Sequence, residues 1–242
     1  MADADLHFYF DPVCPFAWMT SKWVRIVQRQ RDYHVDWRFI SLRLINANVD
    51  YDAHFPPEYE ASHTAGLKLL RVAARIRDER GSEPLGAFYK VLGEETFERE
   101  PVPGGSAAAV HRGTHALATE ALTRNGLPAD YASALEDASW DSVIQAETDE
   151  ALSLTGKDVG TPILHFAPPD GNALFGPVIS RLPDETEALE LWEHVIALGR
   201  FPGFAELKRS MREQPQLPSF GVRPGEVGVQ EDWHAGSRRL KK

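Results

Sequence analysis

Segments typical of β-strands occur near both ends of this 242-residue chain, and a long stretch with only helical patterning separates them. The first two strand-like segments are Leu6–Phe10, which is aromatic and apolar, and 34–41, where apolar and polar residues alternate. A helical pattern runs between them from Phe16 to Gln30. A strand, a helix and a second strand in this order predict a right-handed unit with parallel strands. Two more strands are predicted at Ile163–Phe166 and Ala173–Phe175, joined by a loop rich in Pro and Gly.

The long middle stretch predicts helices, because its apolar residues recur at helical spacing and several segments end at glycine. The predicted helices are 58–80, 85–97, 107–125, 129–138 and 142–154 in the middle, then 185–198 and a short one at 204–212. This order predicts an α/β protein: a thioredoxin fold with a large all-helical insertion between its βαβ and ββα halves.

The same order sets the expected domain boundaries. Residues 1–56 and 157–212 are predicted to form the thioredoxin-like domain, and 57–156 the helical insertion. From residue 213 onward Pro, Gly and charged residues dominate, so 213–242 is predicted to be a poorly ordered tail.

Cys14 lies at the junction between the first strand and the first long helix. Pro12 ends the strand, and Pro15 suits the first turn of a helix, where its missing N–H costs nothing. The unpaired N–H groups and the positive end of the helix dipole point at this position and stabilise a thiolate. The sequence therefore predicts that Cys14 is a nucleophile with a pKa below the ordinary value for cysteine.

Composition excludes several function classes. The net charge of −10 argues against nucleic-acid binding and against binding to anionic membranes. The chain has one cysteine, so it cannot form an internal disulfide. An acidic N-terminus leads directly into the first strand without a signal-peptide pattern, and no apolar run is long enough to cross a bilayer, so we expect a cytoplasmic protein.

Several blocks of the chain resemble DsbA-like oxidoreductases, in particular the actinobacterial group that includes mycothiol-dependent nitroreductases. The segment around the cysteine reads Phe-Asp-Pro-Val-Cys-Pro-Phe-Ala-Trp from Phe10 to Trp18, where that group typically reads F-D-P-x-C-P-W-C-W. Further matching blocks are Ser41-Leu42 with Leu44-Ile45-Asn46, then Val159-Gly160-Thr161-Pro162, Phe175 to Ser180, Leu191 to Glu193 and Phe204 to Arg209. The similarity spans roughly residues 6 to 212.

The resemblance implies a site around Cys14. It implies a cis bond before Pro162, close to the cysteine, with Thr161 offering backbone groups to an extended thiol substrate. Pro15 and Phe16 would lie beside Cys14, and Phe16 would be an apolar platform. Asn46 and Tyr59 are candidates for lining the pocket; otherwise they are a loop cap and a packed aromatic residue.

Ala17 departs from the resemblance, because relatives usually carry a second cysteine there. Without it the chain cannot resolve a mixed disulfide internally, which leaves monothiol chemistry at Cys14 with an external thiol. That thiol would be mycothiol, or glutathione outside the actinobacteria. We expect a small-molecule thiol or electrophile as partner, no tightly bound cofactor, and a homodimer as one possible assembly.

Two alternatives remain open from the sequence. Kappa-type glutathione transferases and hydroxychromene carboxylate isomerases share the architecture, but they usually carry serine at the nucleophile position. A redox-inactive binding or scaffold protein is the other alternative; a low Cys14 pKa favours the enzyme and a normal one the scaffold. No metal site is predicted, because His111 and His115 have zinc spacing without the glutamate of H-E-x-x-H.

Overall fold

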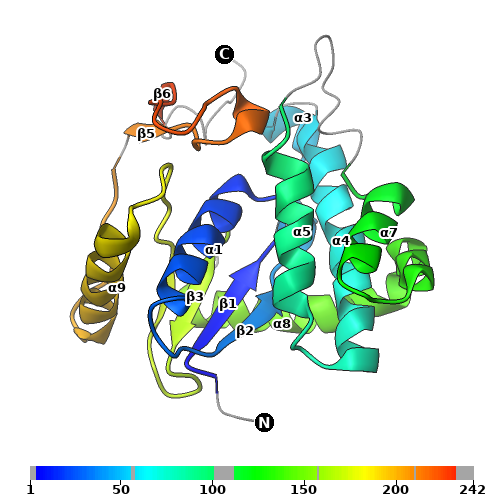
Figure 1. Cartoon of the computed structure of the whole chain (residues 1–242), viewed down its shortest axis with the longest axis horizontal. Coiled ribbons are helices and arrows are strands. Elements are labelled where there is room, and N and C mark those ends of the chain that lie inside the picture. The colour runs from blue at the N-terminus through cyan, green and yellow to red at the C-terminus, as the bar shows by residue number, and fades with distance from the viewer. Residues whose placement is uncertain (1–3, 56–57, 101–111, 157, 210, 233–242) are drawn as a thin grey trace.

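The computed structural model describes residues 4–55, 58–100, 112–156, 158–209 and 211–232. A four-stranded sheet with strand order β2-β1-β3-β4 lies at its centre (Figure 1). The strands are β1 (Leu6–Phe10), β2 (Val35–Phe39), β3 (Ile163–Phe166) and β4 (Ala173–Phe175). β1 pairs with β2 in parallel, whereas β3 pairs antiparallel with both β1 and β4. This topology, with a helical insertion between β2 and β3, is the predicted thioredoxin-like arrangement.

Helices cover both faces of the sheet. On one face lie α1 (Pro15–Gln28) and α9 (Glu185–Arg200), and α8 (Asp141–Thr155) lies behind the sheet (Figure 1). The remaining elements of the insertion are α2 (Leu42–Ile45), α3 (Tyr51–His54), α4 (Glu58–Arg80), α5 (Leu85–Phe97), α7 (His115–Arg124) and the 3-10 helices η1 (Ala129–Glu136) and η2 (Ala138–Trp140). Among the described residues, no helix is both long enough and apolar enough to cross a bilayer.

One hydrophobic core joins the sheet, α1 and the insertion. The strand residues that face α1, such as Phe8 and Phe10, are almost fully buried with Trp18 and Trp23 of α1. Phe10 stacks on Tyr89 of α5 with ring centroids 4.0 Å apart. The aromatic residues that flank Cys14 in the sequence are therefore the ones that attach the insertion to the sheet.

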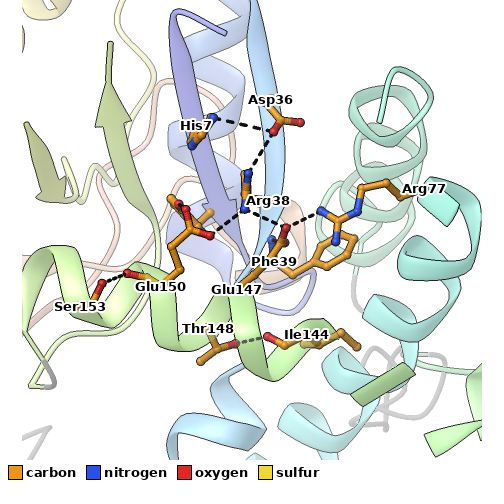
Figure 2. Close-up of polar contacts among 11 residues, drawn as sticks. His7, Asp36, Arg38, Phe39, Arg77, Ile144, Glu147, Thr148, Glu150 and Ser153 are labelled. Carbon is orange, nitrogen blue, oxygen red and sulfur yellow. Dashed lines mark hydrogen bonds and ion pairs between the residues drawn. The ribbon is translucent and has the colours of Figure 1, made fainter. Parts of the chain in front are cut away.

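Glu147 of α8 is a polar joint between the insertion and the sheet (Figure 2). Its carboxylate accepts hydrogen bonds from Arg77 of α4 at 2.6 Å and from the backbone N–H of Phe39 at 2.8 Å. Arg38 of β2 lies 3.1 Å from the same carboxylate and 2.7 Å from Glu150. Because Glu147 is only 7% exposed, these partners compensate the cost of burying its carboxylate.

Two predicted helices differ in the structure. The segment predicted as a helix at 129–138 forms 3-10 turns, since Asp137 takes an extended conformation and its carboxylate caps Ser139. The helix predicted at 107–125 begins at His115, where Thr114 caps it; residues 107–111 lie outside the described residues. Gly113 precedes this cap with a φ of 68°, which is outside the helical range, and a Cβ atom there would lie 2.8 Å from Ala65.

The C-terminal predictions are wrong for the part that the structure describes. Residues 204–209 form no helix, and residues 213–232 are not a disordered tail. Instead β5 (Met211–Glu213) pairs antiparallel with β6 (Gln230–Asp232), and the 3-10 helix η3 (Pro218–Phe220) lies between them. Leu217 is fully buried in the main core and Val222 is also buried, so a few apolar residues anchor a segment whose composition is mostly polar. Residues 233–242 lie outside the described residues.

Candidate active site

Cys14 is the N-cap residue of α1, as predicted. Its backbone is extended, Pro15 occupies the first helical turn, and its sulfur accepts a hydrogen bond from the backbone N–H of Ala17 at 3.4 Å. The backbone N–H of Cys14 donates to the Asp11 carbonyl at 3.0 Å. The turn between β1 and α1 therefore fixes the direction of the Cys14 side chain.

Thr161 lies directly beside Cys14, although 147 residues separate them. The Cys14 thiol donates to the backbone carbonyl of Thr161 at 3.3 Å, and the Thr161 hydroxyl donates to the Tyr9 carbonyl at 2.9 Å. The Thr161–Pro162 bond is cis, as the resemblance implies, and the Pro162 carbonyl accepts from Gly176 N–H at 2.9 Å. The structure thus brings together Cys14, Pro15, Thr161 and Pro162.

The protonation of Cys14 does not follow the prediction. The side chain is 7% exposed, and burial raises the pKa of the thiol to about 12. The charge of Asp11 raises the pKa further, whereas the backbone N–H groups of Ala17 and Phe16 lower it. The prediction of a low pKa is wrong for this closed arrangement, because the loss of hydration outweighs the helix N-terminus.

Asp11 is fully buried and ties the cysteine loop to its surroundings. Its carboxylate accepts from the backbone N–H of Val13 at 3.0 Å and of Leu42 at 2.8 Å. Gly66 of α4 packs so closely against Asp11 and Val13 that a Cβ atom there would lie 2.4 Å from the carboxylate. Burial raises the pKa of Asp11 to about 7. Asp11 therefore satisfies two backbone donors of the loops around Cys14.

Phe16, Asn46 and Tyr59 are the remaining candidates. Phe16 is half-buried against the main core. The Asn46 side chain donates to the Leu42 carbonyl at 2.8 Å and caps α2. Tyr59 is 40% exposed and stacks on Phe55 with centroids 5.6 Å apart. Capping and stacking match the structural alternatives for Asn46 and Tyr59, and a role in substrate binding remains a prediction for both.

Sequence reasoning missed a tyrosine–histidine pair at the start of the insertion. The Tyr51 hydroxyl lies 2.9 Å from Nδ1 of His63, and both side chains are buried. Burial and the nearby Arg43 charge lower the pKa of His63 to about 4, so its ring is neutral at pH 7. The two residues lie on different helices and form no spaced motif, which leaves no signal in the sequence. Among the described residues, no cluster of three or more His, Cys, Asp or Glu could hold a metal ion.

Comparison with known proteins identifies the family. Residues 13–209 match the model of the family described as Rv2466c-like, mycothiol-dependent nitroreductase Rv2466c. The chain belongs to the Rv2466c-like family. It is also 32% identical over 203 residues to the uncharacterized protein Rv2286c of Mycobacterium tuberculosis, covering 84% of this chain and 80% of that protein.

The chain is also similar to solved structures at low sequence identity. The cytosolic disulfide reductase DsbM from Pseudomonas aeruginosa is 14% identical, with a TM-score of 0.49, covering 80% of this chain and 98% of that chain. DsbA from Chlamydia trachomatis is 9% identical, with a TM-score of 0.49, covering 83% of this chain and 91% of that chain. Within the Rv2466c-like family, the feature of this chain that bears most on its chemistry is its single cysteine.

Proposed function

We propose that this member of the Rv2466c-like family is a monothiol thiol–disulfide oxidoreductase, with Cys14 as nucleophile and mycothiol as the resolving thiol. The placement of the Cys14 sulfur supports this most strongly. It lies at the N-terminus of α1, between the Ala17 N–H and the Thr161 carbonyl, and it is the chain's only sulfur able to attack a disulfide. The chemistry suits a reducing cytoplasm, where free thiols are abundant.

The proposed reaction has two exchange steps. The Cys14 thiolate attacks the mycothiol sulfur of a mixed disulfide, the S–S bond breaks, and the other thiol leaves as a thiolate. A second mycothiol thiolate then attacks this sulfur of the Cys14–mycothiol disulfide, which releases mycothiol disulfide and regenerates Cys14. Because Ala17 has no sulfur, the external thiol must perform the second step.

The chain's own groups prepare Cys14 for attack. The Ala17 and Phe16 N–H groups favour the thiolate, while burial opposes it. Water that reaches the site when it opens removes the burial penalty and leaves these N–H groups in place. We propose that the backbone at Thr161, which already accepts from the Cys14 thiol, hydrogen-bonds a substrate that lies along it, and that Phe16 contributes an apolar surface to the site.

A redox-inactive binding protein is the second candidate, and one observation favours it. The pKa of Cys14, raised to about 12 by burial, keeps the thiol protonated at neutral pH in the closed structure. A protein that lost catalysis together with its second cysteine would tolerate such a thiol.

A turnover assay separates the two candidates. The substrate is a mixed disulfide of mycothiol with thionitrobenzoate, and the absorbance of released thionitrobenzoate is followed in the presence of reduced mycothiol. We expect wild type to accelerate release over the uncatalysed exchange, and Cys14→Ser, which keeps the size of the side chain, to lose the acceleration. Equal rates for the two proteins would reject the enzyme. The same assay with the glutathione mixed disulfide tests the preference for mycothiol.

A further inference from the structure

The segment Met211–Val222, called the strap below, is anchored at one end to the loop that follows β4. Arg181 forms two hydrogen bonds to the Glu213 carboxylate, at 2.8 and 2.6 Å. The backbone N–H of Gln216 donates to the Ser180 carbonyl at 2.7 Å. These contacts fix the strap to the thioredoxin-like half of the molecule.

The other end of the strap is anchored to the helical insertion. Leu217 is fully buried in the core that contains residues of α1 and α5, and η3 packs against α5. Val222 closes the turn, with its N–H donating to the Leu217 carbonyl at 3.3 Å. Gly221, with a φ of 70°, makes this tight turn possible. The strap therefore bridges the two parts of the protein.

The N-terminal part of α1 lies between these two anchors. On one side the Thr20 hydroxyl of α1 donates to the carbonyl of Pro177, in the loop that leads to Ser180, at 2.7 Å. On the other side the Trp18 indole N–H donates to Glu98, at the end of α5, at 2.7 Å. A segment that runs from Ser180 to α5 therefore spans from one side of α1 to the other. Figure 1 shows the strap, in orange, above that end of α1 and between α9 and α5.

Leu217 of the strap belongs to the same buried cluster as Cys14, and Cys14 is only 7% exposed. The family match ends at residue 209, just before the strap begins, so the family similarity does not itself describe this element.

We propose that the strap is the outer wall of the Cys14 site and sets its size limit, admitting low-molecular-weight disulfides and excluding the disulfides of folded proteins. The substrate class rests on the function proposed above, whereas the wall itself does not. The strap is held by the buried side chains of Leu217 and Val222 and by the Arg181–Glu213 contact near the surface, so few apolar residues anchor it. Local opening at such an element requires no unfolding of the core.

The experiment compares two reagents of the same chemistry and different size. N-ethylmaleimide and a maleimide carried on a long polyethylene glycol chain both react with the Cys14 thiolate, so the thiol pKa cancels in the ratio of their rates. Cys14 is the only cysteine, so labelling reports on this site alone. In wild type we expect the large reagent to be disfavoured by about tenfold or more, relative to the same ratio for a free cysteine peptide.

Leu217→Ala should release the strap and restore much of the reaction with the large reagent, while the small reagent gains much less. Leu122→Ala is the matched control, since it removes the same atoms from an equally buried leucine on α7. Glu213→Gln loosens the surface anchor without making a cavity, and it should change the ratio in the same direction by a smaller amount. It keeps the test informative if Leu217→Ala does not fold.

Two outcomes overturn the proposal. One is a wild-type ratio equal to that of the peptide, and the other is an equal change of the ratio in the Leu217 and Leu122 variants. A negative result in the mycothiol turnover assay would not affect the ratio of the two maleimide rates, because alkylation of Cys14 needs no enzyme activity. The wall and the proposed function are therefore tested separately.

Discussion

At the scale of single residues, two opposing effects act on Cys14. Its position at the helix N-terminus can be predicted from the sequence, because a strand, Pro12 and Pro15 surround it. Its burial cannot be predicted in this way, because the groups that cover it come from Thr161 and from elements far along the chain. The sequence thus predicts the location of the sulfur correctly and the direction of its pKa shift wrongly.

Ala17→Cys should convert the monothiol site into a dithiol site. The Ala17 N–H already donates to the Cys14 sulfur, so a side chain at 17 lies on the same face of the first turn. We expect the oxidised variant to form an internal 14–17 disulfide and to lose any mycothiol adduct rapidly, as seen by intact-mass spectrometry. Ala17→Ser is the size-matched control and should keep the adduct. A persistent adduct on the cysteine variant would show that the two side chains do not meet.

Asp11 should make the protein less stable as the pH rises. Its pKa is raised from 3.8 to about 7 in the folded protein, so between these values the folded state binds more protons than the unfolded state. The free energy of unfolding therefore falls as pH rises from about 4 to about 7, by up to the order of 4 kcal/mol.

The measurement is urea unfolding of wild type and Asp11→Asn between pH 4 and pH 8. Asparagine does not titrate, so the stability of the variant relative to wild type should rise across this range, on top of a constant loss from one backbone acceptor. Asp149→Asn, at an exposed position of α8, gives the background of removing one carboxylate. A difference for Asp11→Asn that stays flat with pH would contradict the account.

At the scale of elements, α8 is held to the sheet by the Glu147 joint (Figure 2). Glu147→Gln should cost about 3–5 kcal/mol of unfolding free energy, because it leaves Arg38 and Arg77 without their shared buried partner. Glu150→Gln is the control on the same helix. Its side chain is 41% exposed, so we expect a loss of about 1 kcal/mol or less. Urea unfolding measures both variants. Equal losses of unfolding free energy would show that Glu147 contributes no more to stability than the half-exposed Glu150.

The elements themselves divide into predictable and unpredictable ones for physical reasons. The strands Leu6–Phe10, Ile163–Phe166 and Ala173–Phe175 and the helix Glu58–Arg80 have the predicted bounds, because their apolar spacing and end signals agree with their packing. No helix forms at residues 204–209, where one was expected to run from 204 to 212. Met211–Glu213 instead pairs with Gln230–Asp232, and the sequence of neither segment predicts this pairing. The local spacing of apolar residues therefore mispredicts secondary structure where pairing with a distant segment determines it.

At the scale of the whole molecule, the order of the elements predicts the insertion into a thioredoxin fold, but not how the chain closes over its site. The tail was predicted from composition, and composition counts Leu217 as one apolar residue among many polar ones. Its complete burial depends on core residues of α1 and α5, which lie far from it in the sequence. The central proposal is monothiol exchange with mycothiol. It has to be tested on the full chain, because the strap, the insertion and the single cysteine all contribute to the site.

Intact-mass spectrometry of the full chain after incubation with mycothiol disulfide tests that claim most directly. We predict that wild type gains one mycothiol, that Cys14→Ser gains none, and that reduced mycothiol removes the adduct. A wild-type chain that stays unmodified, while the urea-unfolded chain is modified, would contradict the claim and favour the redox-inactive protein.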